Sequence, residues 1–249
     1  MTRRDSQAGF TLVEVLIATT LVMALTTGIL VALRVSLDAM DHADTKLMHN
    51  RRVMAVNRIL ESQVSDIIPA MVTCRARGEG PSGPPVAFFQ GEPQTMRFIS
   101  SYSLNDSSRG LPQILEYQVI PGEKSEGVRL VVNEFLYSSP LSAGLFCAGA
   151  RNAPGSGDSL PIFRPVEIGP GSFVLADRLS ACHFEFLQPD RNDPDKPPVW
   201  VALWTRALLP DAIRVVMAPL DPDPSQLQLQ TLTIPVRVNQ DPSVDYGQQ

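Results

Sequence analysis

Glu14 is the one ionisable side chain in a long apolar run from Phe10 to Leu33, which contains no Lys, Arg, Asp or Pro. On insertion scales, a charged residue costs about 2.5–3.5 kcal/mol at the centre of a membrane helix and less near an interface. A buried carboxylate is tolerated when a cation pairs with it. Glu14 therefore either lies at headgroup depth without a role or awaits a cationic partner inside the membrane, and we favour the second interpretation.

The three cysteines, Cys74, Cys147 and Cys182, allow at most one disulfide within the chain. Cys182 alternates in step with Phe184 and Phe186, so it is expected on the core side of a strand. Cys74 and Cys147 both lie in glycine-rich, loop-like surroundings. We therefore predict a Cys74–Cys147 disulfide, with the absence of any disulfide as the main alternative.

Histidines and nucleophiles do not form a catalytic pattern in the sequence. His42 and His49 are two helical turns apart, which is too far for a pair of metal ligands, and His183 has the solvent parity of its strand. The chain contains no Gly-x-Ser-x-Gly elbow, His-Glu-x-x-His pair or phosphate-binding glycine loop. We expect the protein not to be an enzyme.

Two acidic loops contain the oxygen ligands that Ca²⁺ prefers. The first holds Asp190, Asp193 and Asp195, and the second holds Asp221 and Asp223. Because neither loop has a compact ligand spacing, we expect solvated turns and no cofactor, with Ca²⁺ as the alternative.

A single long helix must position Glu14. The run from Phe10 to Leu33 would be about 36 Å long, enough to cross a hydrocarbon core about 30 Å thick with some tilt. From Arg34 to Ile68 the sequence has no Gly or Pro, and apolar residues recur three or four apart. We predict an amphipathic extension of the helix that Pro69 ends. The C-terminal half of its apolar stripe should pack on the protein's own domain.

After a Gly/Pro-rich loop at residues 78–85, the apolar period changes from helical to alternating. Short, evenly spaced strands then predict antiparallel sheets packed against the helix, an α+β fold. The predicted strands are 86–89, 95–102, 114–120, 128–136, 172–175, 179–187, 199–205, 212–218 and 227–238. The Gly-, Pro- and Ser-rich segment 143–170 is expected to be a surface loop.

The charged residues predict how the chain is oriented in the membrane, and the net charge bears on nucleic acid as a partner. The chain has 249 residues and a net charge of −5, which gives no support for nucleic-acid binding. Arg3 and Arg4 precede the apolar run and should stay in the cytoplasm. Everything after Leu33 would then lie outside the inner membrane.

The sequence Gly-Phe-Thr-Leu-x-Glu-x-Leu at residues 9–16, after a short basic leader, resembles the signal of type IV prepilins and type II secretion pseudopilins. The resemblance implies that a prepilin peptidase cuts between Gly9 and Phe10 and methylates the new N-terminus of Phe10. Glu14, the fifth mature residue, would pair with the N-terminal amine of a neighbouring subunit. A cleaved secretory signal is disfavoured because the apolar run is too long and lacks a closing small-residue cleavage pattern.

Three later segments, Leu175–Leu187, Trp200–Trp204 and Leu209–Val216, resemble in their order the J-type minor pseudopilin of type II secretion. This implies a subunit at the tip of a periplasmic pseudopilus that supports filament initiation and protein export. The implied partners are the prepilin peptidase, I-type and K-type minor pseudopilins, the major pseudopilin and an inner-membrane assembly platform. The membrane-proximal half of the helix stripe would pack on these subunits.

The resemblance organises the chain into five parts: a leader at 1–9, a transmembrane segment at 10–33, a helix extension at 34–68, a periplasmic β-rich domain at 69–240 and a tail at 241–249. Two alternatives remain open. The chain could be a minor pilin of a type IV pilus or competence filament. It could also be a membrane-anchored periplasmic binding or enzymatic domain that uses a prepilin-type signal.

Overall fold

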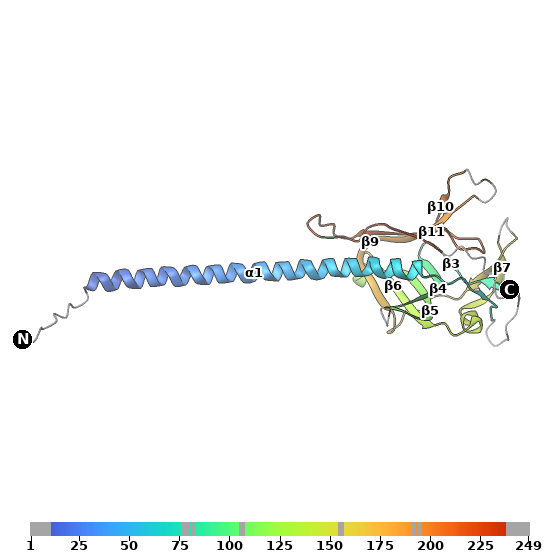
Figure 1. Cartoon of the computed structure of the whole chain (residues 1–249), viewed down its shortest axis with the longest axis horizontal. Helices are drawn as coiled ribbons and strands as arrows, with labels where there is room; N and C mark the ends of the chain where they lie inside the picture. The colour runs from blue at the N-terminus through green and yellow to red at the C-terminus, as the bar shows by residue number, and fades with distance from the viewer. Residues whose placement is uncertain are drawn as a thin grey trace, which may run out of the picture. The chain divides into compact units, whose positions relative to one another are not determined.

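The computed structural model describes residues 11–75, 80, 83–104, 108–153, 157–190, 193 and 196–237. Its first element is helix α1, which extends from Leu12 to Ser65 (Figure 1). The chain divides into two compact units, one ending at Arg51 and the other beginning at Arg52. We call the second unit the sheet domain; it includes the last turns of α1.

Helix α1 ends three residues before the predicted end at Ile68, so Pro69 is not what stops it. The backbone N–H of Ile68 donates to the carbonyl of Ile99 at 2.8 Å, and Ile67 forms a bridge with Ser100. Pairing with the sheet therefore takes these residues out of the helix before the proline is reached.

Within the described residues, the main sheet has eight strands, and every pairing in it is antiparallel. Seven strands follow the order β12-β11-β9-β6-β5-β4-β3, and β10 pairs with β9. The predicted α+β arrangement of a long helix and antiparallel sheet is confirmed. The strands are β3 (Gln90–Gly91), β4 (Thr95–Ser103), β5 (Ser108–Pro121), β6 (Val128–Leu136), β9 (Phe173–Gln188), β10 (Val199–Val201), β11 (Ala212–Pro219) and β12 (Leu232–Pro235).

The predicted strand bounds are nearly correct for β4, β6 and β11 and differ elsewhere. The two strands predicted at 172–175 and 179–187 form one strand, β9, which passes through a left-handed residue, Arg178, with φ 53°. Strands β10 and β12 are shorter than predicted, and β5 is longer.

The sheet curls until its β3 edge returns to β9. The N–H of Phe184 donates to the carbonyl of Pro93 at 2.9 Å, and the N–H of Trp204 donates to Gly91 at 2.8 Å. A Cβ atom on Gly91 would come within 2.8 Å of both the Phe186 ring and the Trp204 side chain. Glycine is therefore required where the two edges approach.

The segment 143–170, predicted to be a surface loop, is folded instead. It continues from helix α2 (Pro140–Ala143) and a 3-10 turn (Gly144–Phe146) into a hairpin of β7 (Cys147–Asn152) and β8 (Ser159–Phe163). We call the described residues of this region, 139–153 and 157–168, the cover segment. It lies on the sheet face opposite α1, where Ala143 and Cys147 are fully buried. Two short strands, β1 (Met71–Val72) and β2 (Val86–Ala87), pair beside it, and a second 3-10 turn, Glu123–Ser125, precedes β6.

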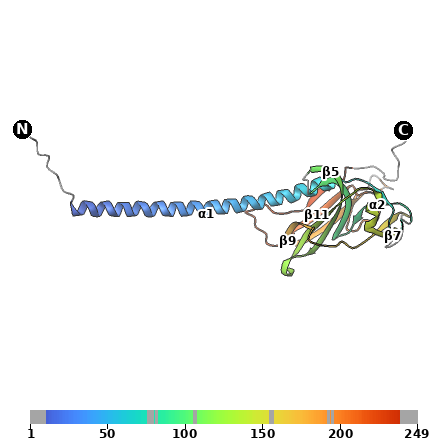
Figure 2. The same ribbon diagram turned by 90° about the horizontal axis from the view of Figure 1, so that it is seen from below.

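Alternate residues of each strand lie on opposite faces of the sheet, and side chains on both faces are buried. On one face the last turns of α1 pack against the sheet (Figures 1 and 2). The predicted apolar stripe is confirmed for this half of the helix. The buried helix residues are Val53, Val56, Leu60, Gln63 and Val64. Their neighbours on the sheet include Met96, Phe98, Tyr117, Phe184 and Phe186.

Cys182 is buried on this helix-facing side, as its parity with Phe184 predicts, and it is a free thiol. Burial raises the pKa of the Cys182 thiol from 9.0 to about 12. We expect iodoacetamide at pH about 8 to leave this thiol unmodified in folded protein and to alkylate it after denaturation. Mass spectrometry of the alkylated peptide checks this, and equal alkylation rates in the two states would contradict it.

The raised pKa of Cys182 also makes the free energy of unfolding depend on pH. In the unfolded chain the thiol ionises near pH 9.0, whereas in the folded protein it stays protonated up to about 12. Between these two pH values the folded state holds a proton that the unfolded state has lost. The free energy of unfolding therefore falls as the pH rises from about 9 to about 12. This contribution should disappear from the pH dependence of a Cys182→Ala variant measured by chemical denaturation.

Candidate functional site

Glu14 lies in the first turn of α1, where Thr11 caps the helix. The N–H of Glu14 donates to the Thr11 hydroxyl oxygen at 3.3 Å and to its carbonyl at 3.1 Å. Thr and Glu three residues apart form the pattern of a capping box, in which Glu or Gln at the third position suits the helix start. The reciprocal bond from the Thr11 N–H to the Glu14 carboxylate is not formed between these two described residues. The cap leaves the Glu14 side chain exposed and without a partner in the described part of the chain.

The apolar segment after Glu14 is exposed on every side. All large apolar side chains from Leu12 to Leu37 are more than half exposed. Each threonine hydroxyl of this segment bonds to a carbonyl three or four residues earlier, as hydroxyls in helices often do. The distances are 3.0 Å for Thr19, 2.9 Å for Thr20, 2.9 Å for Thr26 and 2.8 Å for Thr27. The segment therefore presents an apolar cylinder with its polar groups satisfied internally.

Among the described residues, α1 is the one helix long and apolar enough to cross a membrane. A buried core helix or a signal sequence can pass the same test of length and composition, and none of this apolar window is buried. An unburied apolar helix must be covered by lipid or by other helices, since apolar surface gains about 25 cal/mol per Å² on leaving water. The structure is thus compatible with membrane anchoring.

The predicted processing residues Gly9 and Phe10 lie outside the described residues, as do the leader 1–9 and the tail 241–249. Cleavage and methylation at this junction stay predictions. The membrane-proximal stripe of the extension, which includes Met40 and Leu47, is exposed at 62% and 47%. Its packing on neighbouring subunits is likewise a prediction.

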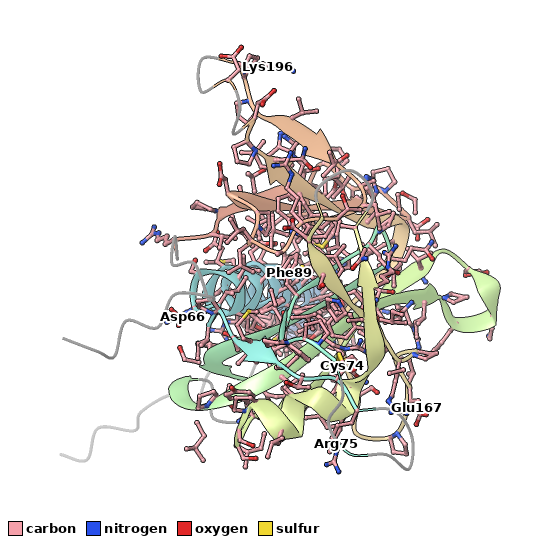
Figure 3. All side chains as sticks on the ribbon, turned by 90° about the vertical axis from the view of Figure 1, so that its right-hand side faces the viewer. Asp66, Cys74, Arg75, Phe89, Glu167 and Lys196 are labelled. Atoms are coloured by element: carbon pink, nitrogen blue, oxygen red, sulfur yellow. A yellow bond between two sulfur atoms is a disulfide. The ribbon has the colours of Figure 1, made fainter. Side chains whose placement is uncertain are left out.

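Cys74 and Cys147 form a disulfide across the second face of the sheet, with Cα atoms 5.2 Å apart. Figure 3 labels Cys74 beside the yellow sulfur atoms. Hydrogen bonds flank it: the N–H of Arg75 donates to Gly144 at 3.1 Å, and the Arg164 guanidinium donates to the Arg75 carbonyl at 2.8 Å. These contacts join the segment that follows α1 to the cover segment.

A buried ion pair beneath the cover segment was missed by the sequence analysis. Arg97 on β4 and Glu116 on β5 face each other in register, with side-chain exposures of 1% and 6%. The Arg97 Nε donates to Glu116 at 2.7 Å, and its other nitrogens donate to the Gln90 side chain at 2.8 Å and the Arg164 carbonyl at 3.0 Å. The Phe163 ring lies 4.7 Å from the Arg97 guanidinium carbon. Desolvation lowers the pKa of Arg97, and the charge of Glu116 opposes that change.

Metal ligands are not gathered in the part of the chain that the structure describes: no group of three or more His, Cys, Asp or Glu could hold an ion there. Asp190 pairs with Lys196 at 3.0 Å, and Asp221 pairs with Arg178. Asp195 lies outside the described residues. The two acidic loops are thus engaged in ion pairs on the surface.

Comparison with known protein families identifies the N-terminal segment. Residues 4–30 match the family model described as the prokaryotic N-terminal methylation motif. The match spans the Gly9–Phe10 junction, Glu14 and the first part of α1, so the chain carries a type IV pilin-like signal. It does not extend to the sheet domain. No curated protein and no solved structure matches the chain.

Proposed function

We propose that the chain is a minor pseudopilin of J type, located at the tip of a type II secretion pseudopilus. The observation that carries the proposal is the methylation motif at residues 4–30, which coincides with an exposed apolar helix. Glu14 on this helix has no side-chain partner among the described residues. The order of the segments Leu175–Leu187, Trp200–Trp204 and Leu209–Val216 supports the J type. The role is structural and not catalytic, and it supports filament initiation and protein export.

Processing prepares the subunit for assembly. A prepilin peptidase removes residues 1–9 and methylates the amine of Phe10, while α1 anchors the protein in the inner membrane. The Glu14 carboxylate then accepts the N-terminal cation of a neighbouring subunit. In low dielectric such a pair fixes both affinity and axial stagger, because either charge alone would be costly to bury.

The sheet domain, on the periplasmic side, is suited to a tip. A repeated shaft subunit must fit a tight helical array, whereas a tip subunit need not. The proposed partners are the I-type and K-type minor pseudopilins, the major pseudopilin and the assembly platform. Co-purification with these subunits, and not with type IV pilus or competence components, would separate this proposal from the alternative of a minor pilin.

The processing step can be tested by producing the full chain in cells with and without a prepilin peptidase. With the peptidase, we expect an intact mass that begins at N-methylated Phe10; without it, the leader should remain. A protein from peptidase-containing cells that still begins at Met1 would overturn the filament proposal.

The role of Glu14 can be separated from helix capping by comparing Glu14→Gln with Glu14→Val. Gln keeps the capping-box side chain but has no charge. If charge pairing is the role, both variants should incorporate into filaments roughly tenfold less than wild type, equivalent to about 1.4 kcal/mol. Both should still insert into the membrane. Incorporation is measured by immunoblotting sheared filaments.

Asp38→Val, which removes an exposed acid of α1 outside the apolar run, is the matched control and should incorporate normally. Normal incorporation of Glu14→Gln together with failure of Glu14→Val would assign Glu14 to the cap and contradict the pairing role.

A second candidate function, a membrane-anchored binding domain, is favoured by one observation. The sheet domain contains a cavity lined by two arginines and several apolar side chains. Such mixed cavities are typical of ligand sites.

A further inference from the structure

A cavity of about 160 Å³ lies in the sheet domain where three segments distant in sequence meet. They are β3 with the residues around it, the β7–β8 hairpin, and the loop at 203–206. Its apolar walls come from Phe89, Leu160, Phe163 and Trp204. Phe89 is labelled in Figure 3. A cavity of about 150 Å³ with apolar walls can hold a molecule the size of benzene, so this space can admit an aliphatic side chain.

The walls of this cavity are fixed before any ligand arrives. The rings of Phe89 and Trp204 both contact Phe186, with centroids 5.8 and 6.4 Å away. The Trp204 indole N–H donates to the Leu208 carbonyl at 2.8 Å, and the Trp204 backbone N–H donates to Gly91. The Asp158 carboxylate at the hairpin accepts from the N–H of Ala207 at 3.3 Å. Preorganised walls lower the entropy cost of binding.

Two arginines line the cavity without an acidic partner among the described residues. Arg151 on β7 is exposed and Arg206 is half-buried, and neither side chain makes a hydrogen bond or ion pair with any other described residue. The third charged residue of the lining, Glu92, accepts from the Gln90 amide at 3.0 Å. The residues that line the cavity therefore carry two positive charges and one negative charge, on a chain of net charge −5.

We propose that this cavity binds an acidic peptide segment in which an aliphatic side chain is flanked by carboxylates. The aliphatic group fills the space between Phe89, Leu160 and Trp204, and the carboxylates pair with Arg151 and Arg206. Inorganic phosphate would satisfy the arginines alone and leave the apolar walls uncovered. This inference does not depend on the filament proposal, and either can fail without the other.

The test uses the full-length protein in detergent micelles and the peptide acetyl-Asp-Leu-Glu-amide. Saturation-transfer NMR should show contact at the leucine methyl groups. The matched peptide acetyl-Asn-Leu-Gln-amide, which lacks charge, should bind at least tenfold more weakly, because hydrogen bonds to charged groups are the stronger ones. Each of the variants Arg151→Gln and Arg206→Gln should bind the acidic peptide roughly tenfold more weakly than wild type.

Arg129→Gln is the control variant, since Arg129 pairs with Glu123 and does not line the cavity. It should bind the acidic peptide as wild type does. Circular dichroism must show that the variants are folded. Equal binding of the two peptides, unchanged affinity in Arg151→Gln and Arg206→Gln, or displacement of the peptide by inorganic phosphate at equal concentration would overturn the proposal.

Discussion

Replacing Arg97 with methionine is expected to lower the free energy of unfolding by about 3–5 kcal/mol. The substitution leaves the Glu116 carboxylate without its cationic partner on a buried sheet face, where its side chain is 6% exposed. The Gln90 side chain and the Arg164 carbonyl also lose their donor. A buried acceptor that loses its donor keeps its full desolvation penalty. Urea denaturation of the full chain in detergent, followed by near-UV circular dichroism, measures the change.

The double variant Arg97→Met/Glu116→Leu should be more stable than Arg97→Met alone. Removing both charges avoids the isolated carboxylate, which is the larger cost. Recovery should be incomplete, because Asn133 donates to Glu116 at 3.3 Å and loses that acceptor. Arg178→Met is the control: Arg178 pairs with Asp221 at an exposed site, where such pairs contribute about 0–1 kcal/mol. If Arg97→Met were at least as stable as Arg97→Met/Glu116→Leu, the isolated Glu116 carboxylate would not be the larger cost, and the prediction would be wrong.

The helix and the helix-facing core could be predicted from the sequence because the spacing of apolar residues indicates which side chains are buried. Val56, Leu60 and Val64 recur at helical spacing, and Phe184 and Phe186 alternate along a strand; all five are buried together. The position of Glu14 could also be predicted, since one acid in an apolar run is a clear signal. Its cap was not predicted, although Thr11 and Glu14 have the spacing of a capping box.

The second face of the sheet could not be predicted. Arg97 and Glu116 each alternate with apolar neighbours, which is the pattern of solvent-exposed positions in a half-buried strand. They become buried only because the cover segment lies on them, and the strands of that segment, β7 and β8, are interrupted by Gly149 and Pro161. Without strong alternation the segment gave no strand signal. The strand register would have been needed to show that the two charges face each other.

Removing the Cys74–Cys147 disulfide is expected to lower the free energy of unfolding by about 4 kcal/mol in the chain-entropy description. The bond closes a loop between residues 73 positions apart, and long loops lose the most entropy in the unfolded chain. It also holds the cover segment over Arg97, since Cys147, the first residue of β7, directly follows the turn that carries Phe146. The variant is Cys74→Ala/Cys147→Ala, measured by urea denaturation of the full chain in detergent.

Cys182→Ala is the matched control, because it removes a buried sulfur without opening a cross-link. It should cost about 1 kcal/mol, as small core truncations do. A thiol reductant separates the cross-link from packing: it should destabilise wild type and Cys182→Ala alike and leave the double variant unchanged. If the loop entropy is the main term, reduced wild type and the double variant should then unfold at similar urea concentrations. A double variant as stable as oxidised wild type would show that the hydrogen bonds of Arg75 and Arg164 are enough to hold the cover segment in place.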